Sequence, residues 1–363
     1  MKILWVFGFH EASGYARNSR EFMKAFDANG VEVKFLYDID IEYPDRDEIR
    51  RFEIKPCELD GFDYDIVIQN VIPTCFKRIG KKKNIIMTVA ETDRVSEEWI
   101  HYCNMADELW TMSYFSASAF VTSGLKIPHF ISLMPIDTEK IRSSNSENFL
   151  IKKEEGSFIF FANSEWTPRK GWDILLDAYF SEFKDEDRTC LLIKTCCFSK
   201  CENTPSIKNE ILEYKQKYNA KCQCVVINDV ISIEDVWGLN KQADAFVLPS
   251  RGEGCGIGYL ESLSLGKPIV APAKGGQVDY FIDGISFPVA CKITQAFRFP
   301  HKPNYDKTMR WITTDIDDLK KKMRLVKEMK SKKIISNYWF DLFKNKFGIN
   351  GSEIKKVIER IKL

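Results

Sequence analysis

Short apolar runs alternate with longer amphipathic stretches along most of this chain, and this alternation restricts the possible folds more than any other feature. Residues 2–9 are almost all apolar, as expected for a parallel strand that is covered on both faces. A loop containing Gly14 follows, and residues 15–28 then carry apolar side chains at helical spacing until Asn29 and Gly30 end the pattern. The sequence thus begins with a strand, a loop and a helix, which is the repeating unit of a parallel α/β sheet.

The same unit recurs in two series. A polar stretch at residues 143–155 separates them, and residues 172–183 in the second series form a helix with one apolar face. We therefore predict an α/β protein with two Rossmann-like, doubly wound parallel-sheet domains, residues 1–150 and residues 151–334, which face a central cleft. Ligands of such sheets bind at the carboxyl ends of the strands. The strand candidates are residues 31–37, 66–69, 85–89, 108–112, 129–132, 158–162, 190–195, 224–228, 245–248 and 268–271.

Length and hydropathy agree with this prediction. A chain of 363 residues fits about two domains. No apolar run reaches the roughly 18 residues that a membrane span needs, and the apolar start is too short for a secretory signal and runs into Glu11. We expect a cytoplasmic protein.

The C-terminal region is strongly basic. Residues 320–363 hold 14 Lys and Arg against 4 Asp and Glu, although the whole chain has a net charge of only +1. These charges could meet the acidic remainder of the chain, where residues 1–152 hold 19 Lys and Arg against 24 Asp and Glu. The alternative is that this tail, with residues 77–83, contacts an anionic membrane surface or a nucleic acid, which would make the protein peripheral to the membrane.

The chain has 11 cysteines, an odd number that favours free thiols in a cytoplasmic protein. Five of them lie near one another in the sequence, but they include no C-x2-C pair and no histidine lies nearby, so free thiols are expected rather than a zinc site. The five are Cys196, Cys197, Cys201, Cys222 and Cys224.

The most informative segment is residues 243–262. A strand ends at Leu248, a loop with three alternate glycines follows, and a helix begins near Gly256. Glycines at such a position let backbone N–H groups approach an anion at a helix N-terminus. The segment matches neither the P-loop pattern nor a strand-linked G-x-G-x-x-G, which argues against nucleotide hydrolysis and nicotinamide binding.

Glu253 and Glu261 lie in this segment, eight residues apart. On a helix that spacing corresponds to about 12 Å, which is too far for the carboxylate pair of a glycoside hydrolase. The two carboxylates could instead bind the sugar and the ribose of one extended ligand whose phosphates lie on the helix start. The simpler alternative is a surface glutamate on a glycine-rich turn.

These residues give the chain a family resemblance. With four further segments, the two glutamates resemble the E-x7-E motif of the retaining family-4 glycosyltransferases of GT-B fold, and the resemblance covers roughly residues 1–320. The segments are Trp166-Thr167-Pro168-Arg169-Lys170-Gly171-Trp172-Asp173, Leu265-Gly266-Lys267-Pro268 with Gly275-Gly276, Glu91-Thr92-Asp93, and Ala106-Asp107-Glu108-Leu109-Trp110.

The resemblance implies a role for each matching residue. Glu253 would hold the donor sugar, Glu261 the ribose, and Lys170 the donor diphosphate. It also implies that a C-terminal helix at about residues 335–363 packs back on the first domain. The other donor-side positions are Gly14 in the first-domain loop, Gly254, Cys255, Gly256 and Ile257 at the helix start, and Asp229 near the nucleobase.

The sequence departs from the family at one position. Many relatives place an arginine several residues before the lysine, where this chain has Ala162-Asn163-Ser164. Arg169, which neighbours Lys170, is the candidate replacement.

Acceptor-side candidates come from the first domain. Glu91 and Asp93 follow a strand, His10 ends the first strand, and Tyr15 flanks Gly14, so each could contact an acceptor hydroxyl. Structural alternatives stay open, because His10 could be a loop histidine, Tyr15 a core aromatic, and Ser13 only a helix cap.

The resemblance implies transfer of a sugar from a nucleoside-diphosphate sugar to an acceptor hydroxyl with retention of configuration. No protein nucleophile and no cofactor are required. We expect no metal, since D-x-D sequences such as those at Asp38, Asp63 and Asp315 are expected by chance among 52 acidic residues. The alternative function is a catalytically silent protein of the same fold that binds nucleotide sugars or acts as a scaffold. The sugar, the base and the acceptor are not determined by the sequence.

Overall fold

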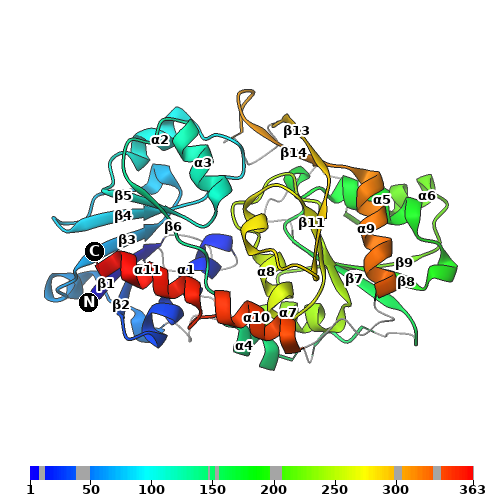
Figure 1. The fold of residues 1–363 in the computed structure, drawn as a ribbon, viewed down its shortest axis with the longest axis horizontal. Coiled ribbons are helices and arrows are strands. Elements are labelled where there is room, and N and C mark those ends of the chain that lie inside the picture. Colours follow the sequence, from blue (N-terminus) through cyan, green and yellow to red (C-terminus); the bar gives the residue numbers. More distant parts are fainter. Residues whose placement is uncertain are drawn as a thin grey trace. The chain divides into compact units, whose positions relative to one another are not determined.

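The chain is built on two six-stranded sheets, each made of parallel strands, with helices on their faces (Figure 1). The computed structural model describes residues 1–7, 13–37, 50–145, 148–151, 155–196, 207–297, 305–329 and 337–362. It divides into two compact units, of which one is Met1–Thr138 with Leu342–Leu363 and the other is Glu139–Asp341. The predicted α/β fold with two doubly wound parallel sheets is confirmed.

The sheet of the first unit has the strand order β2-β1-β3-β4-β5-β6, and every pair is parallel. Helix α1 begins where the Ser13 Oγ accepts a hydrogen bond from the Ala16 N–H at 3.2 Å. It packs on the sheet through Phe22 and Phe26, whose rings lie 5.8 and 6.1 Å from that of Trp5. The elements are β1 Lys2–Phe7, α1 Gly14–Ala28, β2 Glu32–Tyr37, β3 Ile66–Asn70, β4 Lys83–Met87, α2 Glu97–Cys103, β5 Glu108–Thr111, α3 Tyr114–Thr122, β6 His129–Ile131 and α11 Ser352–Lys362.

The sheet of the second unit has the order β12-β11-β10-β7-β8-β9. Strands β7, β8 and β9 follow one another to one edge of the sheet. The chain then returns to the other side of β7, where β10, β11 and β12 follow one another to the opposite edge. The direction in which strands are added therefore reverses between β7 and β10. The elements are β7 Phe158–Asn163, α5 Trp172–Glu182, β8 Thr189–Thr195, α6 Ile207–Lys217, β9 Gln223–Asn228, α7 Ile233–Gln242, β10 Ala245–Val247, α8 Ile257–Ser264, β11 Ile269–Pro272, β12 Ser286–Val289, an antiparallel pair β13 Cys291–Gln295 and β14 Arg310–Thr314, and α9 Ile316–Met329.

Two helices straddle the limits of the units. Helix α4 (Thr138–Ser143) and the described residues after it are tied to α7, because the Lys241 ammonium donates to the carbonyls of Arg142 and Ser144, and the Gln242 amide to that of Phe149. The second unit therefore begins before residue 151, where the sequence placed the boundary. The C-terminal stretch consists of two helices, α10 (Asn337–Phe347) and α11.

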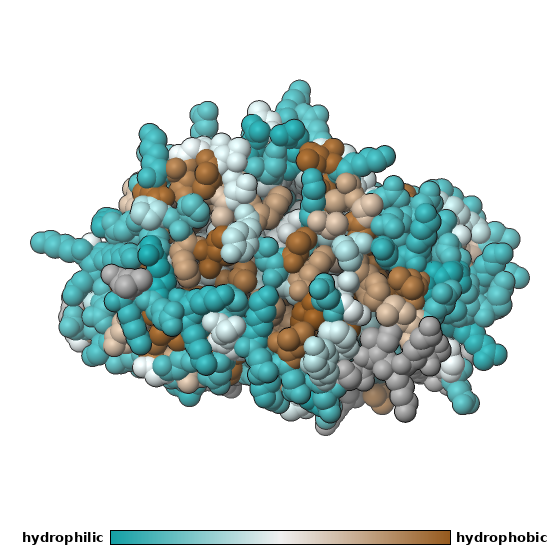
Figure 2. All heavy atoms as spheres, in the orientation of Figure 1, coloured by the Kyte–Doolittle hydropathy of each residue, from teal (hydrophilic) through white to brown (hydrophobic). Residues whose placement is uncertain are grey.

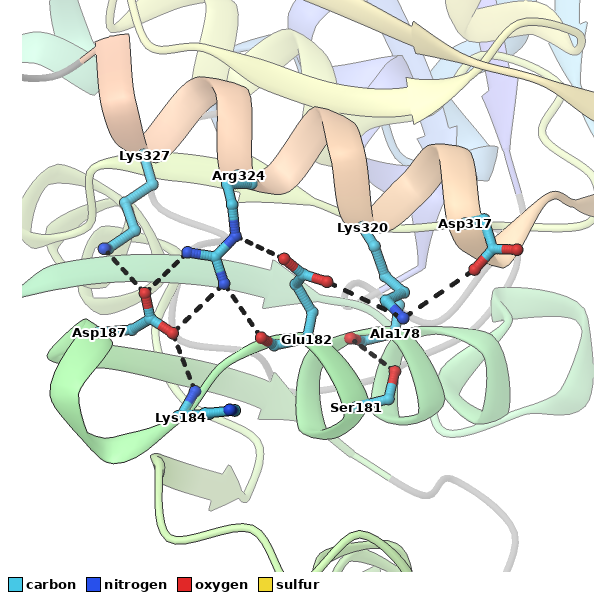
Figure 3. A network of polar contacts seen from close by, with 9 residues as sticks. All are labelled: Ala178, Ser181, Glu182, Lys184, Asp187, Asp317, Lys320, Arg324 and Lys327. Atoms are coloured by element: carbon cyan, nitrogen blue, oxygen red, sulfur yellow. Dashed lines mark hydrogen bonds and ion pairs between the residues drawn. The ribbon is translucent and has the colours of Figure 1, made fainter.

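Basic side chains of residues 320–363 form ion pairs with acidic side chains in both units. Helix α11 belongs to the first unit, where the Arg360 guanidinium bonds the Glu108 carboxylate at 2.9 Å. Helix α9 lies along α5, and Arg324 there contacts both Glu182 and Asp187, with Lys320 and Lys327 beside it (Figure 3). The tail is therefore matched to acids of the second unit as well as the first.

Polar and charged side chains cover most of the face shown in Figure 2, and apolar side chains appear there in small separate patches. Among the described helices, none is both long enough and apolar enough to cross a membrane.

Candidate functional site

The reversal of the second sheet brings together two loops that are distant in the sequence. Lys170 ends a short 3-10 turn, Pro168–Lys170, that follows β7, and Glu253 lies in the loop after β10. Because β7 and β10 are neighbours, both loops leave the carboxyl edge of the sheet at the same point. Ligands of doubly wound sheets bind at such a reversal. We call residues 167–171 the lysine loop and residues 249–254 the glutamate loop.

A buried ion pair joins the two loops. The Lys170 Nζ lies 2.6 Å from Glu253 Oε1, and the Arg169 guanidinium lies 3.8 Å from Oε2. Burial by itself raises the pKa of Glu253, but the charges of Lys170 and Arg169, with hydrogen bonds from Lys170 and Ser250, hold it below its ordinary value. The carboxylate is therefore ionised and paired.

The start of α8 lies directly after the glutamate loop. Gly256 has a φ of +83° and no side chain caps the helix. A Cβ at this position would come within 2.7 Å of the Tyr259 ring, so the conformation and the space both require glycine. Gly254 and Cys255 are buried, and Ile257 is the first helical residue. A helix start of this kind can accept an anion.

Glu261 lies one turn into α8 and is only 4% exposed. Its Oε1 accepts a hydrogen bond of 2.9 Å from the indole N–H of Trp237, which is completely buried on α7. The sequence does not predict Trp237 as a site residue, because nothing in the local pattern links it to a residue 24 positions later.

Two other predicted donor-side residues have less distinctive surroundings. The Cys255 Sγ lies 3.5 Å from the Tyr280 hydroxyl, and burial raises the pKa of the thiol to about 12, so it is not a nucleophile at neutral pH. Asp229 lies just after β9, where it is exposed and its backbone N–H bonds the Thr195 carbonyl.

The predicted residues of the first unit lie near the carboxyl edge of its sheet. Gly14 opens α1, and the Tyr15 hydroxyl lies 2.8 Å from the Thr88 hydroxyl just beyond β4. Burial raises the pKa of Tyr15 well above its ordinary value. Glu91 and Asp93 lie in the half-buried bends that follow. His10 lies outside the described residues.

No metal site emerges from the part of the chain that the structure describes, because no group of three or more His, Cys, Asp or Glu side chains there could hold a metal ion. Cys196 and Cys222 are buried and Cys224 is half-buried. Cys197 and Cys201 lie outside the described residues.

Arg251 is a second site residue that the local sequence does not predict. It lies in the glutamate loop, but its guanidinium contacts Pro168 and Asp173, which are about 80 positions earlier in the chain. Arg169, the candidate replacement for the missing family arginine, is only 7% exposed and donates to the Gly252 carbonyl at 2.5 Å.

Two doubly wound domains in tandem, each built on a sheet of parallel strands, are the architecture of the GT-B class of fold. Solved glycosyltransferases share it. The structure of a glycosyltransferase from Rickettsia africae aligns with a TM-score of 0.69 at 15% identity, over 99% of this chain and 97% of that one. Anabaena Alr3699/HepE, solved with UDP and glucose, aligns with a TM-score of 0.67 at 15% identity, over 100% and 99% of the two chains.

Sequence comparisons agree for the second unit. Residues 155–297 match the family model of the glycosyl transferases group 1. An uncharacterized glycosyltransferase of Methanocaldococcus jannaschii is 32% identical over 143 residues, 39% of this chain and 36% of that protein. A glycogen synthase of Rhodopirellula baltica is 23% identical over 130 residues, 36% of this chain and 24% of that protein. The matched segments thus span about a third or less of these relatives.

Proposed function

We propose that this protein is a retaining, metal-independent glycosyltransferase that moves a hexosyl group from a nucleoside-diphosphate sugar to an acceptor hydroxyl. The observation that carries the proposal is the Lys170–Glu253 pair at the sheet reversal, directly before the helix start at Gly256. The match of residues 155–297 to a glycosyltransferase family supports it. So does the presence of UDP and glucose in the Anabaena structure of the same fold.

In this reaction the bond between the anomeric carbon and the diphosphate breaks, and a bond to the acceptor oxygen forms on the same face of the sugar. The departing diphosphate takes the acceptor proton. Lys170 and the start of α8 stabilise the negative charge that develops on the leaving group, in the role that a metal ion has elsewhere. Glu253 binds sugar hydroxyls and Glu261 binds the ribose.

Acceptor residues are proposed from the first unit. Tyr15, Glu91 and Asp93 follow strand ends of that sheet, as acceptor-binding groups in a doubly wound sheet would.

The test is a screen of the purified protein against UDP-, GDP-, ADP- and CDP-sugars, with EDTA present. We expect one base class to raise the melting temperature and to release nucleoside diphosphate, slowly to water when no acceptor is added. Glu261→Ala should abolish both effects. The configuration of the product, determined by NMR, tests retention.

Other outcomes have clear meanings. If a donor binds but no diphosphate is released with any acceptor class, the protein is a silent nucleotide-sugar binder. If no donor binds, the proposed function is wrong.

A further inference from the structure

The lysine loop and the glutamate loop are held together by Arg251. Its backbone N–H donates to the Arg169 carbonyl at 2.6 Å. Its guanidinium donates to the Pro168 carbonyl at 2.5 Å and to both carboxylate oxygens of Asp173 at 2.8 and 2.6 Å. Arg251 itself is only 8% exposed. One side chain therefore ties the glutamate loop to the lysine loop and to the first turn of α5.

Contacts in the opposite direction complete the connection. Arg169 of the lysine loop donates to the Gly252 carbonyl of the glutamate loop, and the Ser250 hydroxyl lies 3.3 Å from the Arg169 carbonyl. At Gly171 a Cβ would lie 2.2 Å from the Pro249 carbonyl oxygen. The backbones of the two loops are thus in direct contact.

The reacting pair depends on this connection. Lys170 lies between Arg169 and Gly171, and Glu253 directly follows Gly252, so the backbone of neither functional residue can shift without a residue that the connection holds. We propose that Arg251 is a positioning residue, which sets the geometry of Lys170 and Glu253 before the donor binds. This inference rests on the proposed function of that pair.

Arginine is the residue type that such a role requires. Its planar guanidinium can bond a carboxylate at two points and a carbonyl at a third, whereas a lysine ammonium is a point charge without that fork. Displacement of a reacting group by about 1 Å can reduce turnover about 100-fold.

The experiment compares donor turnover by the full chain carrying Arg251→Lys or Asp173→Asn with that of a matched control. The control is Arg324→Lys, which disrupts an equally extensive arginine–carboxylate network in the same unit, on α9 and α5 (Figure 3). We expect kcat to fall about 10- to 100-fold in the first two variants, while Arg324→Lys keeps wild-type kcat at a similar loss of melting temperature. Added guanidinium ion should partly restore the activity of Arg251→Ala.

Wild-type kcat in Arg251→Lys and Asp173→Asn would overturn the proposal, and so would a loss of kcat no larger than that of the control. Amide hydrogen exchange provides a readout that does not need turnover. We expect faster exchange in both residues 167–171 and residues 249–254 of Arg251→Lys. If the wild type turns over no donor, the proposed function fails. Hydrogen exchange alone then decides whether Arg251 holds the two loops together, and unchanged exchange in Arg251→Lys would overturn this role as well.

Discussion

Lys170 and Glu253 neutralise each other in a place where both side chains are largely buried, with exposed fractions of 14% and 8%. An isolated charge there would cost several kcal/mol of desolvation, which the opposite charge of the partner offsets. The proposed function requires this pair to separate when a donor binds, because Lys170 would then contact the diphosphate and Glu253 the sugar hydroxyls.

Trp237 gives a prediction at the same scale. Trp237→Phe removes the indole N–H that orients the Glu261 carboxylate, while an aromatic ring is kept. We expect the affinity for the nucleoside diphosphate to fall about fivefold, because a hydrogen bond is worth about 1 kcal/mol, with kcat changed less than the affinity. Isothermal titration calorimetry measures the effect.

The control for Trp237→Phe is Trp99→Phe, the same truncation in the first unit, where Trp99 stacks on Phe120. This control should bind as the wild type does. Equal affinities for wild type and Trp237→Phe would show that Glu261 is oriented without Trp237.

Two glycines with positive φ, one after β7 and one after α1, differ in the space around them. Gly171 has a φ of +71° and no room for a Cβ, whereas Gly30 has a φ of +72° with nothing within 4 Å of a built Cβ. The two positions therefore share a left-handed backbone and differ in whether a Cβ would meet other atoms.

We expect Gly30→Ala to lower the free energy of unfolding by about 1 kcal/mol through strain in the left-handed region. Gly171→Ala should lower it by about 1–3 kcal/mol more, because the lysine loop must move away from Pro249. Urea denaturation of both variants measures the difference. Equal losses would mean that the two loops separate at no cost.

The contact of α9 with the 3-10 turn after α5 (Asp185–Asp187) predicts a dependence of stability on pH. Burial by itself raises the pKa of Asp187, but hydrogen bonds from Arg324, the Lys184 backbone and Lys327 lower it from 3.8 to about 2. Since the unfolded state then binds more protons than the folded state between these values, this contribution is complete above about pH 4 and is lost as the pH falls towards 2.

Asp187→Asn should therefore flatten the fall in unfolding free energy between about pH 4 and pH 2. Chemical denaturation at several pH values measures it. Asp63→Asn is the control, because that carboxylate is 90% exposed and its ion pair with Lys82 is long, at 3.9 Å. The same pH profile for wild type and Asp187→Asn would contradict the assignment to Asp187.

For the whole molecule, the basic C-terminal region could pair with acidic side chains of the protein itself or with an anionic surface. Lys320, Arg324, Lys327 and Arg360 each lie within 4 Å of an acidic side chain of this chain. We therefore expect that anionic vesicles bind the protein at low salt and release it at about 0.15 M salt, where exposed charges are screened beyond about 8 Å. Vesicle cosedimentation tests this, and retention at 0.15 M salt would instead support a membrane-facing tail.

Local sequence patterns were enough to predict most elements and to name the candidate residues. The apolar periodicity predicted β7 at residues 158–162 and α5 at residues 172–183, close to their observed bounds. This works because a buried strand or a buried helix face requires apolar residues at a regular local spacing. The glycines of residues 252–256 likewise predicted a loop and a helix start, since positive φ angles and close approaches need glycine.

How these elements pack against one another could not be predicted from local patterns. Local spacing does not specify strand order, and it is the placement of β10 beside β7 that brings Glu253 to Lys170, which is 83 residues earlier. The partners of Arg251 follow from the same placement, whereas Trp237 meets Glu261 through the packing of α7 and α8, the helices before and after β10. A contact between distant residues depends on which loops leave the sheet at the same point, and that arises from the packing of the whole unit rather than from any single segment.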